Sequence, residues 1–139
     1  MRYGIVADIH NDIVRLRDVL EALRQEGATR FLTLGDTLDP LAPPLGADEV
    51  ARTLMDLGTE GVWGNHDMFF SESGETPNFE GFGKASVQFM ALMKPQLILG
   101  DFLLTHRESS VDPVDVGQMW SGCDGTVQLA KIAEEALSA

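Results

Sequence analysis

The 139-residue chain is predicted to form one α/β domain, because strand and helix patterns alternate along its first half. Short apolar runs typical of strands cover residues 2–9, 31–34 and 61–63. Helical patterns over residues 13–23 and about 48–57 lie between these runs. This order is typical of a parallel sheet with right-handed crossovers. Each strand pattern ends in a cluster of polar residues, and ligands gather at the carboxyl ends of strands in such sheets.

The two helices of this first half have recognisable boundaries. Asn11 or Asp12 can cap the first helix, and Gly27 ends it. Its apolar residues recur every three or four positions, at Ile13, Leu16, Leu20 and Leu23. A proline-rich loop precedes the second helix, which begins near Asp48.

The second half of the chain departs from this alternation. A polar, glycine-rich stretch is expected to be a loop, and the residues after it have a helical pattern. Two apolar runs then flank Gly100-Asp101, which fits a two-residue hairpin only loosely. A further loop and a final helix complete the chain. The expected ranges are a loop over 71–83, a helix over 85–93, strands over 96–99 and 102–105, a loop over 107–125 and a helix over about 126–137.

Composition excludes several classes of protein. Acidic residues outnumber basic ones by 22 to 10, and the net charge of −12 argues against binding to duplex nucleic acid. No apolar run approaches the length of a membrane span, and Asp8 comes too early for a signal peptide. Cys123 is the single cysteine, which excludes a cysteine-cage zinc site. We therefore expect a cytoplasmic protein without membrane contact.

The polar clusters contain metal-ligand residues. Asp8 and His10 follow the first strand pattern, and Asp36 follows the second, with Asp39 three residues later. The third pattern is followed by Asn65-His66-Asp67, and a later one by His106. A mixed carboxylate, imidazole and amide set suits Mn, Fe or Zn better than Ca or Mg. Each carboxylate alone would more often cap a helix or turn. Three clusters at three strand ends favour a metal site.

Four blocks in this order resemble the signature of the calcineurin-like metallophosphoesterase family. They are Asp8-Ile9-His10, Gly35-Asp36-Thr37-Leu38-Asp39, Gly64-Asn65-His66-Asp67 and Thr105-His106, and the resemblance covers residues 3 to about 106. The resemblance implies an αββα-sandwich fold. It also implies hydrolysis of phosphomonoesters or diesters by a hydroxide activated between two divalent metal ions.

The resemblance also implies a role for each matching residue. Asp8 and His10 would bind the first metal, Asp36 would bridge both, and Asn65 and His106 would bind the second. His66, held by Asp67, would protonate the leaving oxygen or stabilise charge on the phosphoryl group. Asp39 would orient a neighbouring ligand rather than bind metal.

The chain lacks the family's last block, Gly-His-x-His, which gives each metal one more histidine. Its three histidines are His10, His66 and His106. We therefore expect residues 1–139 to be one metallophosphoesterase-like domain that forms the N-terminal part of a larger one. Alternatively, other groups complete the site, such as Glu108, Asp112, Asp115 or water. An incomplete second sheet would expose an apolar face or edge and favour association into homo-oligomers.

Two other functions remain open on the sequence. The first is a non-catalytic scaffold or interaction module, like the retromer scaffold subunit of this superfamily. The second is a nuclease of the same superfamily, although the net charge of −12 makes duplex DNA a poor substrate. A small phosphoester, a nucleotide or a phosphoprotein is the expected substrate.

Overall fold

A computed structural model describes residues 1–70 and 80–120 of the chain. Its main sheet has the order β1-β2-β3, and all pairs are parallel. The strands are β1 (Tyr3–Val6), β2 (Arg30–Thr33) and the short β3 (Glu60–Gly61). The crossovers carry α1 (Ile13–Gln25) and α2 (Ala47–Asp56). The predicted α/β class and the alternation of strands and helices are therefore confirmed.

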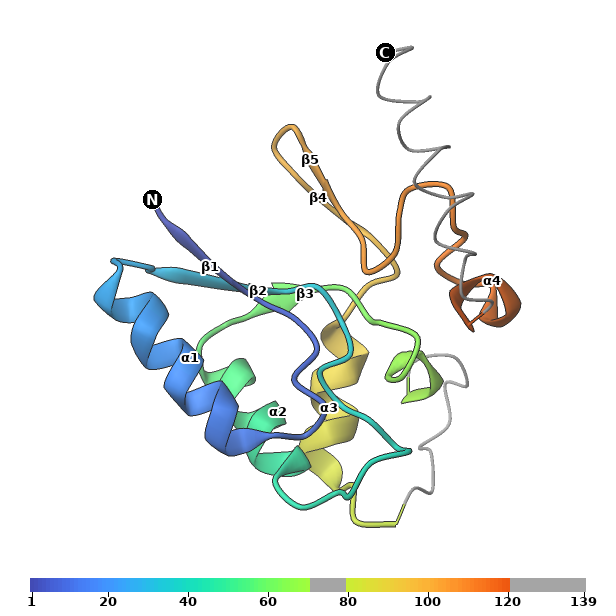
Figure 1. Ribbon diagram of the computed structural model, residues 1–139, viewed down its shortest axis with the longest axis horizontal. Coiled ribbons are helices and arrows are strands. Elements are labelled where there is room, and N and C mark those ends of the chain that lie inside the picture. Colours follow the sequence, from blue (N-terminus) through green and yellow to red (C-terminus); the bar gives the residue numbers. More distant parts are fainter. Residues whose placement is uncertain (71–79, 121–139) are drawn as a thin grey trace.

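The helices lie on one face of the sheet. Figure 1 shows α1, α2 and α3 (Lys84–Leu92) on the same side of the three strands. The main core lies between these helices and the sheet, and its fully buried side chains include Leu16, Val50, Leu54, Phe89 and Met90. None of the helices in the described parts of the chain has the length and apolar content needed to span a bilayer.

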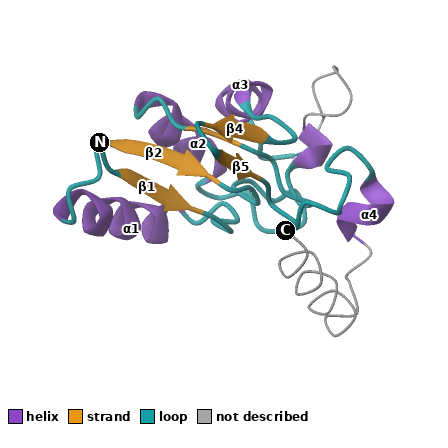
Figure 2. Ribbon diagram, turned by 90° about the horizontal axis from the view of Figure 1, so that it is seen from above, coloured by secondary structure: helices purple, strands orange, loops and turns teal. Residues whose placement is uncertain are grey.

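A hairpin rises on the other side of the sheet. It pairs β4 (Leu97–Leu99) with β5 (Phe102–Leu104) in antiparallel register, and Gly100 at its turn has a φ of +59° (Figures 1 and 2). The predicted hairpin is thus confirmed. Before it, Lys94 forms an isolated parallel bridge with Val62, which ties this part of the chain to the end of β3.

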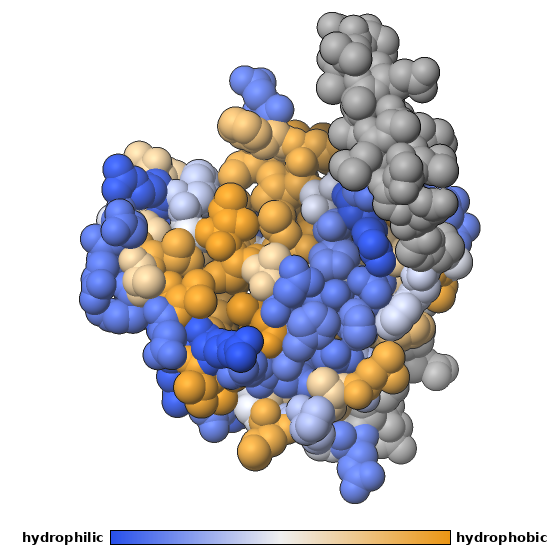
Figure 3. Space-filling view, viewed as in Figure 1, coloured by the Kyte–Doolittle hydropathy of each residue, from blue (hydrophilic) through white to orange (hydrophobic). Residues whose placement is uncertain are grey.

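The face between the sheet and the hairpin is apolar. A groove of about 320 Å³ lies there, lined by side chains that include Tyr3, Ile5, Leu34, Phe102 and Leu103. Figure 3 shows apolar residues gathered over the middle of this view. Phe102 is 74% exposed and Ile5 is 51% exposed. The described residues therefore cover the sheet with helices on one face and leave apolar surface on the other.

Some boundaries differ from the predicted ones. β1 ends at Val6 rather than near residue 9, because Asp8 and His10 have left-handed backbone conformations that no strand accommodates. The region predicted as a loop over 107–125 contains α4 (Val116–Trp120). Asp115 starts this helix, since its carboxylate accepts a hydrogen bond from Gln118 N at 3.0 Å. The predicted helix over 126–137, Cys123 and most of the predicted 71–83 loop lie outside the described residues.

The N-terminus of α3 is capped by a residue of α2. Gly83 has no side chain to cap the helix, and the Asp48 carboxylate accepts from Gly83 N at 3.0 Å and Ser86 N at 3.1 Å, and also from the Ser86 hydroxyl. A Cβ at Gly83 would lie 2.2 Å from Asp48 Oδ2, so glycine is required there. Burial raises the pKa of Asp48, but these hydrogen bonds outweigh it and hold the pKa below its ordinary value.

Replacing Asp48 by Ala should therefore destabilise the protein by about 1 kcal/mol at neutral pH, the usual contribution of a helix cap. Because the folded-state pKa is depressed, the stabilisation is present above the ordinary carboxyl pKa. It is lost as the pH falls through the folded-state value. Urea unfolding of D48A and the parent chain at several pH values measures the difference. The neighbouring E49A, which removes an exposed pair with Arg17, should change stability less. Equal stability of D48A and the parent at every pH would exclude this cap.

Candidate metal centre

The polar residues after the strands converge around Asp36. Asp36 is 4% exposed, and its Oδ2 lies 3.3 Å from His106 Nε2 and 3.7 Å from His10 Nε2. Its Oδ1 accepts from the backbone N–H of His66 at 2.9 Å. Segments from four parts of the chain thus meet at one carboxylate at the carboxyl ends of the parallel strands.

Within the described residues, two groups of potential ligand atoms lie close enough to hold a metal ion. One consists of His10, Asp36 and His66, and the other of Asp8, Asp36 and His106; in each, the ligand atoms lie within 4.8 Å of one another. Asp36 belongs to both groups, as a bridging ligand would. Neither group includes Glu108, Asp112 or Asp115, and the Asp115 carboxylate caps α4 instead.

The remaining predicted ligands lie beside these groups. Asn65 Oδ1 is 3.1 Å from His106 Nε2, so an amide oxygen adjoins the second group. His10 Nε2 is 3.8 Å from Asp8 Oδ1, so these two residues are also neighbours. The compact groups nevertheless place Asp8 with His106, whereas the family resemblance implies that Asp8 and His10 share a metal.

Two glycines allow this convergence. A Cβ at Gly64 would lie 2.1 Å from Asp36 Oδ1, and a Cβ at Gly35 would lie 2.5 Å from Gly64 N and 2.8 Å from His106 Nδ1. Gly35 also has a φ of +97°, which favours glycine. The turns after β2 and β3 therefore touch through their backbones, and any side chain at either glycine would push Asp36 away from Asn65 and His106.

The loop after β1 pairs with the loop after β2 in a non-strand conformation. Asp8, His10, Asn11 and Asp36 have φ values between 46° and 66°, a region that costs a residue with a side chain about 1–3 kcal/mol. Backbone bonds compensate: Asp8 N donates to Gly35 O and His10 N to Asp36 O, both at 3.0 Å. Among the described residues, every non-glycine with positive φ belongs to these two loops. Such clustering of strain is typical of functional sites.

Hydrogen bonds to Nδ1 fix the orientation of two histidines. His106 Nδ1 lies 2.7 Å from Leu34 O, and His10 Nδ1 lies 2.8 Å from Asp39 Oδ2. A carbonyl or carboxylate at this distance requires that Nδ1 carry the proton. In a neutral imidazole, the unprotonated Nε2 is then free to bind metal, and both Nε2 atoms face Asp36.

Asp39 contacts two histidines, as expected of a residue that orients ligands. Its Oδ1 is 3.0 Å from His66 Nδ1, within ion-pair distance but without the alignment of a hydrogen bond. Burial raises the pKa of Asp39, but His66 and His10 outweigh it, so the pKa lies below its ordinary value. Asn11, which is 2% exposed, holds the Asp39 backbone through Asp39 N to Asn11 Oδ1 at 2.9 Å and Asn11 Nδ2 to Asp39 O at 2.8 Å.

Asp67 has a different role from the one the family resemblance implies. Its carboxylate is fully buried and accepts from the backbone N–H groups of Gly64, Thr37 (2.7 Å) and Leu38 (3.4 Å). Burial, with a contribution from nearby Asp36, raises its pKa to about 7 in spite of these bonds. Asp67 therefore joins the turns after β2 and β3, and the carboxylate beside His66 is Asp39. The expectation that Asp67 holds His66 was wrong.

Opposite charges stabilise the centre of the site. Burial raises the pKa of Asp36, but the hydrogen bonds from His106 and His66 N outweigh it and leave the pKa below its ordinary value. For His106, burial lowers the pKa, but Asp36 outweighs burial and the pKa is raised. The anionic form of Asp36 is thus favoured although its side chain is buried, as a bridging metal ligand requires.

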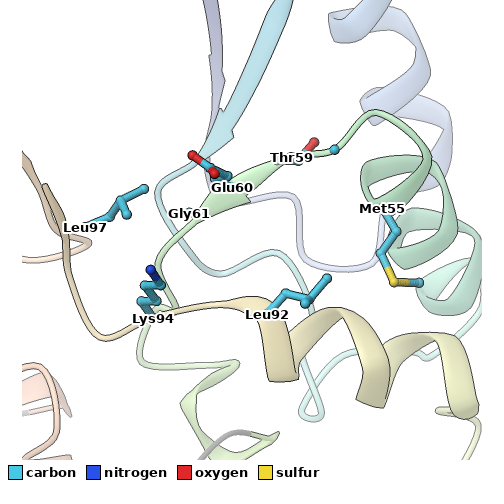
Figure 4. A pocket seen from close by; sticks show the side chains of 8 residues that line it. Met55, Thr59, Glu60, Gly61, Leu92, Lys94 and Leu97 are labelled. Atoms are coloured by element: carbon cyan, nitrogen blue, oxygen red, sulfur yellow. The ribbon is translucent and has the colours of Figure 1, made fainter. Parts of the chain in front are cut away.

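A pocket at another part of the sheet shares no residue with this centre. It has a volume of about 270 Å³ and lies between the C-terminal ends of α2 and α3 and the start of β3 (Figure 4). The apolar side chains of Met55, Leu92 and Leu97 line it, together with those of Thr59, Glu60 and Lys94. Among the described residues, both compact groups of potential metal ligands lie at the carboxyl ends of the strands.

The sequence profile of the calcineurin-like phosphoesterase superfamily domain matches residues 1–126. No curated protein matches the chain in sequence. A solved structure with a similar fold is the crystal structure of a metallophosphoesterase from Sphaerobacter thermophilus, with a TM-score of 0.57 and 22% identity. The match covers 74% of this chain and 45% of that one, so the similarity spans less than half of the thermophile protein. The chain therefore belongs to the calcineurin-like phosphoesterase superfamily.

Proposed function

We propose that the chain is a metal-dependent phosphoesterase that works with two divalent cations, Mn, Fe or Zn. The observation that carries the proposal is the position of the Asp36 carboxylate, which is shared by two compact groups of ligand atoms. A carboxylate between two such groups suits a pair of cations about 3.5–4 Å apart. The mixture of carboxylate, imidazole and amide donors suits these metals better than Ca or Mg.

The proposed ligands are Asp8, His10, Asp36, Asn65 and His106. His66, the third member of the first compact group, is assigned to proton donation instead. When bound, the cations would acidify water and offset the negative charge of the phosphoester. They would also supply the positive charge that this acidic chain lacks. A small phosphoester, a nucleotide or a phosphoprotein is the proposed substrate class.

His66 is the proposed proton donor to the leaving oxygen. Its side chain is 25% exposed, so a substrate can reach it, and its ring lies 4.8 Å from that of His10. The Asp39 carboxylate lies 3.0 Å from Nδ1 on one side of the ring, and the other ring nitrogen is left for the substrate. Asp67 acts on the reaction only by holding the turn that carries His66.

The alternative is a scaffold that keeps the fold without catalysis. It would retain the hydrogen bonds of Asp36 and Asp39 and bind no metal at micromolar to millimolar concentrations. Calorimetric titration of the chain with Mn²⁺ separates the two functions, because the phosphoesterase requires a binding heat and the scaffold gives none.

Replacing Asp36 by Asn, or Asn65 by Ala, should reduce Mn²⁺-dependent hydrolysis of p-nitrophenyl phosphate by more than about 100-fold. The reason is that loss of a direct ligand should exceed the 10–100-fold effect typical of a residue that only supports one. The exposed α1 variant D18N removes a carboxylate outside the site and serves as the control. Hydrolysis by D36N or N65A at the rate of D18N would overturn the proposed ligands.

Replacing Asp39 by Asn should weaken Mn²⁺ affinity by about 10–100-fold while the fold is retained. The neutral amide can still contact His10, but it favours a proton on Nδ1 less than a carboxylate does. Calorimetry measures the affinity, and circular dichroism confirms that the variant is folded. The exposed hairpin residue Asp101, changed to Asn, is the matched control. An affinity equal to that of D101N would show that Asp39 does not support the ligands.

A further inference from the structure

A row of aromatic rings extends from the metal centre. The His66 ring lies 4.8 Å from the Trp120 ring, and the Trp120 ring lies 6.0 Å from that of Phe69. Trp120 is 36% exposed, and Phe69 is also only partly buried. Part of the Trp120 ring is therefore accessible beside the proposed proton donor, where a flat ligand can stack.

Trp120 is held in this place by the rest of the structure. It ends α4, which lies beyond the carboxyl ends of the strands in Figures 1 and 2. Arg107, directly after His106, donates from Nη2 to Met119 O at 3.0 Å. Met119 is 1% exposed and anchors the helix. The bond between Arg107 and Met119 thus connects the neighbour of Trp120 to the neighbour of the proposed ligand His106.

A second bond fastens the loop that leads to α4. Trp63 Nε1 donates to Pro113 O at 3.0 Å, and Trp63 directly precedes the Gly64-Asn65 turn of the metal centre. The segment over 107–120 is therefore attached both next to His106 and next to the Gly64-Asn65 turn. Trp120, at the end of this segment, is therefore held in a fixed position relative to Asn65 and His106.

Resting on the proposed function, we propose that the substrate carries a flat aromatic ring on its leaving group, which stacks on Trp120. The His66 ring contacts both the ring of the proposed ligand His10 and the ring of Trp120. A phosphoryl group at the ligands therefore places the leaving oxygen at His66 and the remainder of the leaving group at Trp120. Aromatic side chains stack with any flat ring, so an aryl phosphate and a nucleotide share this chemistry.

The experiment compares non-hydrolysable phosphonates by calorimetry on the Mn²⁺-loaded full chain. Phenylphosphonate should bind about 5- to 150-fold more tightly than methylphosphonate, the range that stacking on one aromatic side chain gives. In W120A the preference should disappear, whereas W120F should keep most of it. F102A removes an exposed aromatic of the hairpin and should leave the preference unchanged. A methylene phosphonate analogue of adenosine monophosphate distinguishes the two sources, since tighter binding than phenylphosphonate identifies a nucleotide and weaker binding an aryl phosphate.

Three results would overturn the proposal, and they differ in what else they exclude. Equal affinity of the parent chain for phenylphosphonate and methylphosphonate removes the aromatic site and leaves the phosphoesterase intact. Equal weakening of both ligands in W120A shows that Trp120 only supports the fold of the site. Absence of binding by every phosphonate in the presence of Mn²⁺ removes the proposed function as well.

Discussion

The backbone contact between Gly35 and Gly64 is the constraint on which the site depends. At this contact the turns after β2 and β3 approach more closely than any side chain would permit. Asp36 and Asn65 follow the two glycines, so the contact brings a carboxylate and an amide together. Asp67 reinforces it by accepting hydrogen bonds from both turns. The buried anion and the strained loops are stable only because these bonds hold the backbone in place.

The electrostatics of the centre follow from this close packing. Asp36 is removed from water yet remains an acid of lowered pKa, because His106 and the His66 N–H compensate its charge. The Asp39 carboxylate lies beside the Nδ1 atoms of both His10 and His66. The carboxylates of Asp36 and Asp39 thus gather in one small region of a chain whose net charge is already −12. A protein that binds phosphate in this setting needs cations, and the arrangement of donors suits them.

Much of the fold could be predicted, because its strands and helices have clear local signals. The helix over 13–25 and its Asp12 cap follow from apolar spacing and a capping residue. The convergence of Asp8, Asp36 and Asn65 follows from a topological rule for parallel sheets, whereas only the family resemblance adds His106 to them. The helix α4 was missed, because its five residues are too few for a periodic pattern and only Asp115 marks its start.

The roles of individual side chains at the site depend on contacts between residues far apart in the sequence. The spacing of residues along the chain does not predict such contacts. Asp67 is adjacent to His66 in sequence, yet its carboxylate accepts from the backbone N–H groups of Thr37 and Gly64. The sequence indicates only a helix-capping role for Asn11, whereas its side chain bonds to the Asp39 backbone 28 residues away. Asp8 and His10 lie beyond the end of β1, and a left-handed backbone rather than strand geometry brings them into place.

Only one of the two ligand groups depends on the β4-β5 hairpin, because His106 comes just after it. His10, Asp36 and His66 all lie before the hairpin in sequence, whereas the other group is completed by His106, whose ring bonds to Leu34 O across 72 residues. Detachment of the hairpin would dismantle the second group and leave the first assembled. A cation held by the second group would therefore stabilise the docked hairpin, because its binding free energy is available only when the hairpin is in place. Metal occupancy of the second group is in this way coupled to the attachment of the hairpin, whereas occupancy of the first group is not.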